Sequence, residues 1–260
     1  MALTINGQRL DNPQRPYIIA EASGNHAQDY GIAEALVVAA AGAGADAIKF
    51  QTFLGHTIAA EVPIPRGHDA AHDAWLDRLG VRTLQDLFRD RGGLPRAWHQ
   101  PLKALAASRG IAFLSTPFSI DDARFLVEDI HVPALKIASG DITFIPLLQY
   151  AALTGLPLLL STGASTYKEI MDALIVINTA RGCHTYAHLA DVIVLHCRAL
   201  YPCPDELASL AVIKELRDEW NVGAVGWSDH TLDSTLIPAL AVSQGCTVIE
   251  KHFKLAGDVS

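Results

Sequence analysis

The sequence predicts a (β/α)₈ barrel, the parallel α/β fold in which eight strands form a closed cylinder inside a ring of helices. Three observations lead to this prediction. Strand-like apolar runs alternate with helical patterns along the 260 residues, which is typical of repeated βα units. These runs number about eight, and polar side chains follow most of them. A doubly wound open sheet is the alternative, but no G-x-G-x-x-G motif follows the first run.

Each expected strand is a short run of aliphatic and β-branched residues, and the segments between the runs carry apolar residues at helical spacing. The strands are expected at Tyr17–Ala20, Ala45–Phe50, Ile111–Leu114, Ala134–Ala138, Pro157–Leu160, Val192–His196, Gly223–Trp227 and Thr247–Ile249. The helices are expected at Tyr30–Ala43, Arg96–Ser108, Asp121–Asp129, Ile145–Leu153, Thr166–Ala180, Asp205–Trp220 and Ser234–Ser243. This alternation places the carboxyl ends of all strands at one mouth of the barrel.

One connection is much longer than a usual βα loop. It covers residues 52–95, between the second strand and the helix that begins at Arg96, and loops of this length are typically functional or mobile. Two short amphipathic segments lie within it, Asp69–Leu79 and Thr83–Asp90, and the sequence Gly92-Gly93-Leu94-Pro95 closes it. We therefore expect one barrel domain over residues 1–260 with a long insertion after the second strand.

The chain stops at Ser260, soon after the last expected strand, which leaves no room for an eighth outer helix. A barrel without that helix leaves an apolar strip on its eighth and first strands uncovered. Such a strip predicts either a partner surface or a chain that has been cut short.

The composition narrows the class of protein. Half of the residues are hydrophobic, which is ample for a large core, and the formal net charge is −8. This charge argues against a broad nucleic-acid or anionic-membrane surface, because phosphate binding requires a basic face. No apolar run approaches the ~20 residues of a membrane span. The four cysteines show no C-x-x-C spacing and are expected to be reduced thiols in a soluble, cytoplasmic protein.

Two histidines occupy matching positions after neighbouring strands. His230 follows the strand that ends at Trp227, and His252 follows the strand that ends at Ile249. Two neutral imidazoles that meet at one mouth can hold a divalent metal ion, and Asp229 and Glu250 lie beside them. Strand alternation places Glu250 and His252 on one face and Lys251 on the other. The alternative is that each histidine merely caps its own strand.

Two lysines interrupt otherwise apolar strands. Lys49 follows Ala47-Ile48 and Lys136 follows Ala134-Leu135. A lysine that enters a barrel interior is costly unless an anion meets it, so an anionic substrate is expected. The alternative is that the lysines extend outward between helices. Hydroxyls and glycine-permitted N–H groups at Ser139-Gly140 and Ser161-Thr162-Gly163 suit phosphate or carboxylate oxygens, although such residues also act as simple helix caps.

Other histidines lack such a pattern. His26 is as compatible with a structural loop position as with substrate contact. Six further histidines are expected on the surface or in loops: His56, His68, His72, His99, His184 and His188.

The strand-end residues together resemble the sialic acid synthases, which condense phosphoenolpyruvate with an N-acetylated amino-sugar aldehyde. The resemblance follows the strand ends in order across nearly the whole chain. It is carried by Ile18-Ile19-Ala20-Glu21 with Gly24-Asn25-His26, residues 44–52 (GADAIKFQT), Ser115-Thr116-Pro117-Phe118, residues 136–141 (KIASGD), Ser161-Thr162-Gly163, His196-Cys197, Tyr201-Pro202, Ser228-Asp229-His230-Thr231 and residues 249–253 (IEKHF). Any one of these short strings would be poor evidence.

The resemblance implies a TIM barrel with Mn²⁺, or alternatively Mg²⁺ or Co²⁺, on His230 and His252. It implies that phosphoenolpyruvate is held by Lys49, Thr116, Lys136, Ser139, Ser161 and Ser228, and that Glu21, Gln51, Asp141 and Tyr201 lie near the sugar. Glu21, Lys49, Lys136 and His230 are the expected catalytic residues, with Glu21 orienting or deprotonating the attacking water. The expected product is a nonulosonic acid such as N-acetylneuraminate, made by a homodimer.

The sequence departs from the family pattern in three places. Asp141 stands where the family usually has a glutamate, which points to a different sugar. Arg198-Ala199-Leu200 replaces a segment that often carries an asparagine near phosphoenolpyruvate. The family normally continues into an eighth helix and a small antifreeze-like domain, and this sequence contains neither.

Two other functions remain open at this point. The chain is either a synthase or a barrel that binds phosphoenolpyruvate and metal without turnover, and the absence of the C-terminal portion favours the second. A Schiff-base aldolase that uses Lys49 or Lys136 is a third reading, which borohydride trapping with a keto acid would test.

Overall fold

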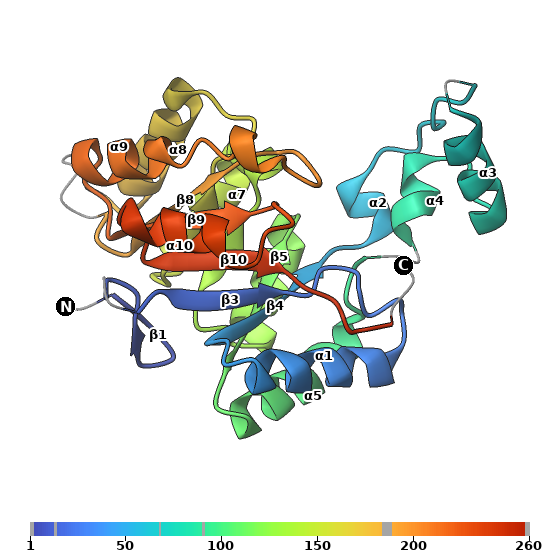
Figure 1. Ribbon diagram of the computed structural model, residues 1–260, viewed down its shortest axis with the longest axis horizontal. Helices are drawn as coiled ribbons and strands as arrows, with labels where there is room; N and C mark the ends of the chain where they lie inside the picture. The colour runs from blue at the N-terminus through green and yellow to red at the C-terminus, as the bar shows by residue number, and fades with distance from the viewer. Residues whose placement is uncertain (1–2, 13–14, 68, 90–91, 184–188, 258–260) are drawn as a thin grey trace.

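The computed structural model describes residues 3–12, 15–67, 69–89, 92–183 and 189–257. Eight parallel strands form one sheet that is nearly closed into a barrel (Figure 1). The strands are β3 (Tyr17–Glu21), β4 (Ala47–Thr52), β5 (Ala112–Pro117), β6 (Leu135–Ile137), β7 (Leu158–Ser161), β8 (Val192–Cys197), β9 (Ala224–Asp229) and β10 (Val248–His252). The expected fold class is confirmed, and the strand positions agree with those expected to within a few residues.

The first and last strands join the two halves of the sheet. β10 pairs with β3 from Val248↔Tyr17 to His252↔Glu21, and with β9 on its other side. The ladder order runs β5-β4-β3-β10-β9-β8-β7-β6, and the two end strands, β5 and β6, lie in contact. This closure brings the carboxyl ends of strands far apart in sequence to one mouth.

The interior changes from apolar to polar along each strand. The lower part is a core of aliphatic and aromatic side chains that includes Tyr17, Ile19, Leu159, Leu195 and Val248. Because side chains alternate between the faces of a strand, the inward positions of β4 are Ala47, Lys49 and Gln51, and those of β10 are Val248, Glu250 and His252. The polar side chains therefore gather at the C-terminal mouth, above a packed floor.

A small N-terminal hairpin, which sequence patterning did not indicate, belongs to the lower core. It consists of β1 (Thr4–Ile5) and β2 (Gln8–Arg9). Leu3, Ile5 and Leu10 are buried in the same cluster as the inward residues of the lower barrel. The hairpin therefore adds apolar side chains to the core at the end opposite the polar mouth.

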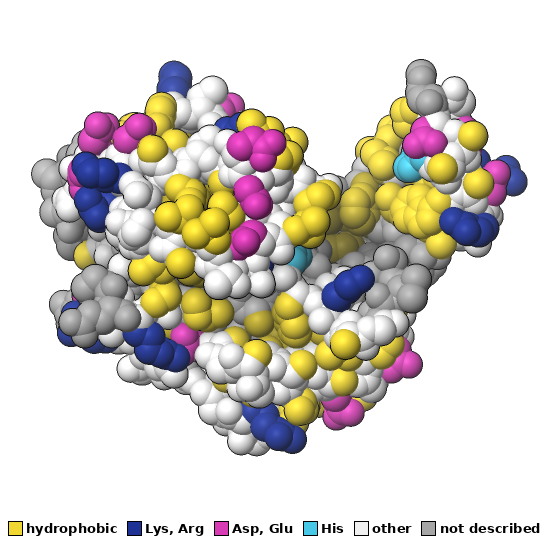
Figure 2. Space-filling view, in the orientation of Figure 1, with side chains coloured by type: hydrophobic (Ala, Val, Ile, Leu, Met, Phe, Trp, Pro, Cys, Tyr) yellow, Lys and Arg dark blue, Asp and Glu magenta, His cyan; other side chains and the backbone are white. Residues whose placement is uncertain are grey.

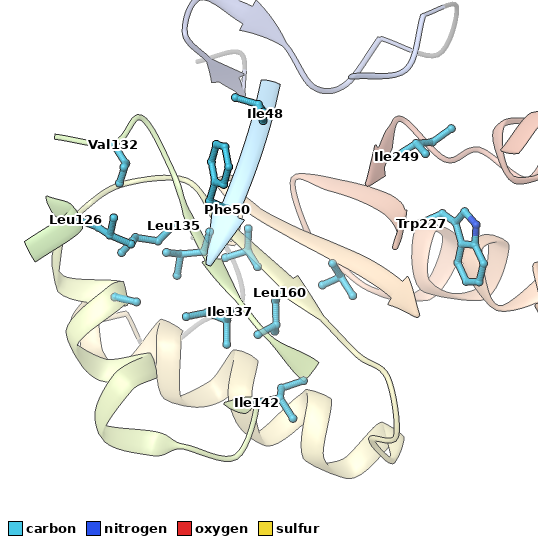
Figure 3. Packing of buried hydrophobic residues seen from close by; sticks show 14 of the residues in the cluster. Ile48, Phe50, Leu126, Val132, Leu135, Ile137, Ile142, Leu160, Trp227 and Ile249 are labelled. Atoms are coloured by element: carbon cyan, nitrogen blue, oxygen red, sulfur yellow. The ribbon is translucent and has the colours of Figure 1, made fainter. Parts of the chain in front are cut away.

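Helices cover most of the outer surface of the barrel. They are α1 (Tyr30–Gly42), α5 (Arg96–Ser108), α6 (Ile120–Arg124) continuing into the π-helical turn η1 (Phe125–Asp129), α7 (Ile145–Leu153), α8 (Tyr167–Ala180), α9 (Ala211–Glu219) and α10 (Leu236–Ser243). The outward residues of the strands, such as Phe50, Ile137, Leu160 and Trp227, form the core with these helices (Figure 3). This second apolar layer, between the sheet and the helices, holds the helices against the outside of the barrel.

The prediction of a single helix over Asp205–Trp220 was wrong. The segment contains a short 3₁₀ turn, η4 (Asp205–Leu207), and then α9 from Ala211. Ser209 between them has φ +52°, a left-handed conformation that is incompatible with a continuous right-handed helix.

The long connection forms an arm that projects from the barrel, as Figures 1 and 2 show. It contains α2 (Gly55–Ile58), α3 (Ala70–Leu79) and α4 (Leu84–Arg89). The two expected amphipathic segments correspond to α3 and α4, except that Asp90 lies outside the described residues. The arm has a small hydrophobic core of its own, which consists of Ile64, Leu76 and Val81. At the base of the arm, the Phe53 ring stacks edge-on against Phe118 at the mouth of the barrel, with centroids 5.4 Å apart.

The outer face is less well covered at the junction of β3 and β10. Ile18 and Ala20, which point outward from β3, are only half-buried, whereas Ile48 and Phe50 on β4 are fully buried. Within the described part of the chain no helix follows β10. The expected uncovered strip is therefore limited to these two half-buried side chains of β3, because Ile249 on β10 is buried. Among the described helices, none combines the length and apolar character needed to cross a bilayer.

Candidate active site at the mouth of the barrel

A cavity of about 440 Å³ opens at the C-terminal mouth. The residues that line it are Glu21, Ser23, Lys49, Gln51, Thr116, Phe118, Lys136, Ala138, Ser139, Gly140, Ser161, Cys197, Ala199, Tyr201, Ser228, His230, Glu250 and His252. They come from all eight strands or the loops that follow them. Eleven of the twelve site residues expected from sequence are among them, and Asp141 is the exception.

Two lysines and two glutamates form a buried ionic cluster in this cavity. The Lys49 ammonium lies 2.5 Å from Glu21 Oε2 and 3.6 Å from Glu250 Oε1, and it donates to Thr116 Oγ1 at 2.9 Å. Lys136 Nζ lies 3.7 Å from the same Glu250 oxygen. Each of the four charged side chains is at most 7 % exposed. Both lysines therefore point inward, and the alternative of lysines extending outward was wrong.

The two lysines differ in how well the protein supports their charge. Burial opposes the charge of Lys49, but the adjacent Glu21 and Glu250 outweigh it and raise the pKa of Lys49. For Lys136, burial dominates and lowers its pKa, because Glu250 is its main carboxylate and Lys49 repels it. Burial also raises the pKa of Glu21. The pKa of Glu250 is lowered, since the two lysines outweigh its burial. Lys136 is thus the cation with the weaker internal support.

Hydroxyl groups surround the two ammonium groups. Ser139 Oγ accepts a hydrogen bond from the Gly163 N–H at 2.9 Å, and Ser228 Oγ donates to Glu250 at 3.4 Å. Ser161 Oγ is buried and has no hydrogen-bond partner among the described residues. A buried hydroxyl without a partner costs free energy, so Ser161 is suited to an incoming polar ligand. A Cβ on residue 163 would lie 2.9 Å from Ser139 Oγ, which explains the glycine there.

The two candidate metal ligands lie side by side. The ring centroids of His230 and His252 are 5.4 Å apart. His230 Nδ1 lies 2.7 Å from the carbonyl oxygen of Arg198, and a carbonyl can only accept, so Nδ1 carries the proton. His252 Nδ1 lies 3.4 Å from Ser23 Oγ. These contacts leave Nε2 of each ring as the nitrogen for an ion.

The chemistry of this pair fits a divalent cation. Burial is the main cause that lowers the pKa of each imidazole to about 4, so both rings are neutral at pH 7 and can donate a lone pair. Metal–nitrogen bonds of about 2.1 Å are compatible with rings 5.4 Å apart. No described group of three or more His, Cys, Asp or Glu side chains is arranged to hold an ion. Two nitrogens would therefore leave other positions to water or substrate.

Gln51 and Tyr201 lie at the outer part of the cavity. The Tyr201 ring packs against His230 at 3.9 Å between centroids and against His252 at 5.8 Å, while 70 % of the residue remains exposed. Gln51 Nε2 donates to Ser23 Oγ at 3.3 Å. Both residues therefore present polar groups beside the histidines and open to solvent.

Asp141 does not line the cavity. It ends the 3₁₀ turn η2 (Ser139–Asp141), and its Oδ2 is buried with no hydrogen-bond partner in the part of the chain that the structure describes. Burial raises the pKa of this carboxyl to about 6, with a smaller opposite effect from Lys136. The family resemblance implied that Asp141 lies near the sugar, but it falls after the end of β6 at Ile137, in a turn where the alternation of the strand no longer applies.

Two histidines outside the cavity have structural positions. His99 was expected on the surface, and this was wrong: it is fully buried in α5 and its Nε2 lies 2.7 Å from Thr52 Oγ1. His26 is also fully buried and packs between Phe50 and Trp98. His56 and His72 are exposed as expected, and His68, His184 and His188 lie outside the described residues.

Sequence reasoning missed Ser23, Phe118 and Cys197 as lining residues. Ser23 Oγ donates to Glu21 at 2.8 Å and also contacts Gln51 and His252, so it connects three expected site residues. Only its position just after Glu21 could have indicated this. Cys197 Sγ lies 3.9 Å from His230 Nδ1, and the inward parity of β8 was the available signal.

The chain is similar to synthases of legionaminic acid and pseudaminic acid. A model of the NeuB family matches residues 36–260. An N,N'-diacetyllegionaminic acid synthase of Legionella pneumophila is 38% identical over 240 residues, 92% of this chain and 64% of that protein. A pseudaminic acid synthase of Helicobacter pylori is 33% identical over 244 residues, 93% and 66% of the two chains.

A solved structure supports the same relationship. The crystal structure of an N-acetylneuraminic acid synthetase of Leptospira borgpetersenii superposes with a TM-score of 0.79 at 30% identity, and covers 98% of this chain and 78% of that one. The chain spans 64% of the length of the Legionella relative and 66% of the length of the Helicobacter relative.

Proposed function

Because this chain belongs to the NeuB family, we propose that it condenses phosphoenolpyruvate with the open-chain aldehyde of an N-acetylated amino sugar. The products would be a nonulosonic acid and inorganic phosphate. The observation that carries the proposal is one cavity that holds two buried lysines beside two neutral histidines. A three-carbon anion and an aldehyde oxygen would need these groups next to each other.

The lysines and hydroxyls would hold phosphoenolpyruvate. Its phosphate and carboxylate carry several negative charges, and buried ammonium groups recognise such groups strongly. Lys49 and Lys136 are the cations, and the hydroxyls are those of Thr116, Ser139, Ser161 and Ser228. Lys136 has the weaker carboxylate support, and Ser161 has an unpartnered hydroxyl. These two side chains would gain the most favourable new contacts when phosphoenolpyruvate binds.

His230 and His252 would hold the divalent ion that the family resemblance implies, Mn²⁺ in our proposal, with Mg²⁺ or Co²⁺ as alternatives. When bound, the ion supplies Lewis acidity to the aldehyde oxygen. The chain fixes the ring orientation of His230 through Arg198 O. Tyr201 and Gln51 would contact the sugar from the open side. The position of Asp141 outside the lining gives its predicted sugar contact no support.

The proposed reaction has two stages. The C3 carbon of phosphoenolpyruvate attacks the aldehyde carbon, so a C–C bond forms, the aldehyde oxygen takes up a proton, and C2 becomes electron-poor. Water then adds to C2 and gives its proton to a base, for which Glu21 is the candidate because its carboxylate lies in the cavity. Breakage of the bond between C2 and the phosphate oxygen then leaves a ketone, as the new C2 hydroxyl gives up its proton to the departing phosphate.

Product release tests the proposal directly. The purified protein would be mixed with phosphoenolpyruvate, Mn²⁺ and single N-acetylated aldoses, including N-acetylmannosamine, and inorganic phosphate would be measured. Sugar-dependent release of phosphate is expected with at least one aldose. Binding of phosphoenolpyruvate without release for every aldose would favour a barrel that binds without turnover. We further propose a cytoplasmic homodimer, for which light scattering after gel filtration would give the subunit number.

A second enzyme function has one observation in its favour. Burial lowers the pKa of Lys136, as in lysines that form Schiff bases. Borohydride treatment with a keto acid would attach the acid covalently to Lys136 in such an aldolase. The synthase reaction forms no imine, so we expect no attachment, and a mass increase on Lys136 would overturn this choice.

A further inference from the structure

Each candidate metal ligand comes directly after a charged residue in the chain, and the two charges have opposite signs. Asp229 precedes His230 at the end of β9, and Lys251 precedes His252 near the end of β10. Asp229 and Lys251 are direct partners in the β9–β10 ladder, and theirs is the last pair in that register. Because side chains alternate across a strand, the charged pair and the two histidines project from opposite faces of the same two strands.

The charged pair is closely bonded. Lys251 Nζ donates to Asp229 Oδ2 at 2.7 Å and to the carbonyl oxygen of Thr231 at 2.8 Å. The second oxygen of Asp229 accepts from the N–H of Thr231 at 2.8 Å and from its hydroxyl at 2.7 Å. The Asp229 side chain is fully buried and that of Lys251 is 21 % exposed. These bonds hold Asp229 and Thr231, the residues directly before and after His230.

His252 depends on its backbone for its position. Its contact with Ser23 Oγ at 3.4 Å is long, whereas His230 has a 2.7 Å bond to Arg198 O. The outer face of β10 is also at the less covered junction with β3, where Ile18 and Ala20 are half-buried. The Asn25 side chain also holds the residue after His252, through a bond from its Nδ2 to the carbonyl oxygen of Phe253 at 2.7 Å. The bond from Lys251 to Asp229, by contrast, directly joins the two strands that carry the rings.

We propose that the Asp229–Lys251 ion pair is a positioning clamp that sets the distance between His230 and His252 for a divalent ion. Neither clamp residue lines the cavity, so both act through the backbone of the adjacent histidine. Side chains that orient metal ligands in this way typically change metal affinity by about 10- to 100-fold when removed. The inference rests on the proposed metal role of the two histidines.

Mn²⁺ binding to the full chain, measured without substrates by electron paramagnetic resonance, tests the clamp. We expect Lys251→Met to weaken Mn²⁺ binding by about 10- to 100-fold, and Lys251→Arg to recover most of it because the cross-strand charge returns. Arg15→Met is the matched control. It removes the cation from another buried carboxylate, Asp46, bonded at 2.7 Å near the start of β3 and β4, and should leave the Mn²⁺ affinity unchanged.

A double variant separates the clamp from general stability. Asp229→Asn with Lys251→Met removes both charges and leaves no unpaired ion in the interior, so the fold should recover relative to Lys251→Met alone, as judged by thermal unfolding. Mn²⁺ binding should stay weak, because the link between the strands is still missing. Recovery of binding together with stability would overturn the clamp.

The remaining outcomes are also distinct. Parent-like Mn²⁺ affinity in Lys251→Met would overturn the clamp and leave the metal site intact. Equal weakening in Arg15→Met and Lys251→Met would show a general effect of stability and would also overturn it. A parent protein that binds no Mn²⁺, alongside an equally inert His230→Ala variant, would refute the proposed metal site itself.

Discussion

Replacing each buried lysine of the cavity with methionine should have different consequences for stability and the same consequence for activity. Methionine matches the length of the lysine stem but carries no charge. Lys49→Met removes the cation from Glu21, which lies 2.5 Å away with its side chain 2 % exposed. Lys136→Met leaves Glu250 with Lys49 at 3.6 Å. The first change orphans a buried carboxylate and the second does not.

The magnitudes follow from this difference. Removal of one partner from a buried ion pair costs about 3–5 kcal/mol, so Lys49→Met should lower the unfolding free energy by that amount. At about 2–4 °C per kcal/mol for a domain near this size, Tm should fall by roughly 6–20 °C. Burial opposes the charge of Lys136 and lowers its pKa, so loss of that charge offsets the lost contact with Glu250. Lys136→Met should stay within about 1 kcal/mol of the parent.

Thermal unfolding followed by circular dichroism at pH 8 and pH 5 measures both effects. In Lys49→Met the pKa of Glu21, already raised by burial, should rise further, so the folded state binds the additional proton. Its stability is then retained at low pH and lost as pH rises, and the gap to the parent should widen from pH 5 to pH 8. Both variants should lose sugar-dependent phosphate release. Equal Tm losses in the two variants would refute the charge assignment.

Three other substitutions test single side chains. His230→Ala should reduce Mn²⁺-dependent phosphate release by about 100-fold or more, the scale of one lost electrostatic contact in a transition state, with the fold largely intact by circular dichroism; unchanged activity would remove its metal role. Glu250→Gln removes the carboxylate shared by both lysines and should tighten phosphoenolpyruvate binding on the order of tenfold in calorimetry, whereas weaker binding would contradict a role as internal counter-ion. Asp141→Asn should gain stability relative to the parent as pH rises from about 4 to about 6, because with its pKa raised to about 6 the folded parent still holds a proton over a range in which the unfolded chain has lost it. With solvent access the gain at pH 8 is on the order of 1 kcal/mol, and a Tm difference that stays the same from about pH 3.5 to pH 8 would count against the shift.

The strand positions and the membership of the cavity were accessible from the sequence because both depend on short-range periodicity. Alternation placed Lys49 and Gln51 on one face of their strand, and Glu250 and His252 on one face of theirs. A closed parallel barrel then brings all strand ends to one mouth. Nearly all expected site residues line the cavity for this reason. The roles of these residues, including metal and substrate binding, remain proposals.

Local periodicity failed where the chain leaves a regular element. Asp141, whose sugar contact the resemblance implied, lies after β6 in a 3₁₀ turn, where strand parity does not fix the direction of a side chain. The left-handed Ser209 divides what reads as one continuous helix. His99 has no distinguishing neighbours in sequence, and only the packing of α5 on β4 and β5 buries it against Thr52 and Phe113.

Sequence by itself determined which side chains reach the mouth of the barrel, and the tertiary structure decided which of them pair. Lys136 on β6 and Glu250 on β10 are distant in the chain and lie in contact only because the sheet closes on itself. The same closure gives Lys49 two carboxylates and Lys136 one. Charge pairing depends on distances of a few ångströms across the barrel, and no pattern within one strand contains that information.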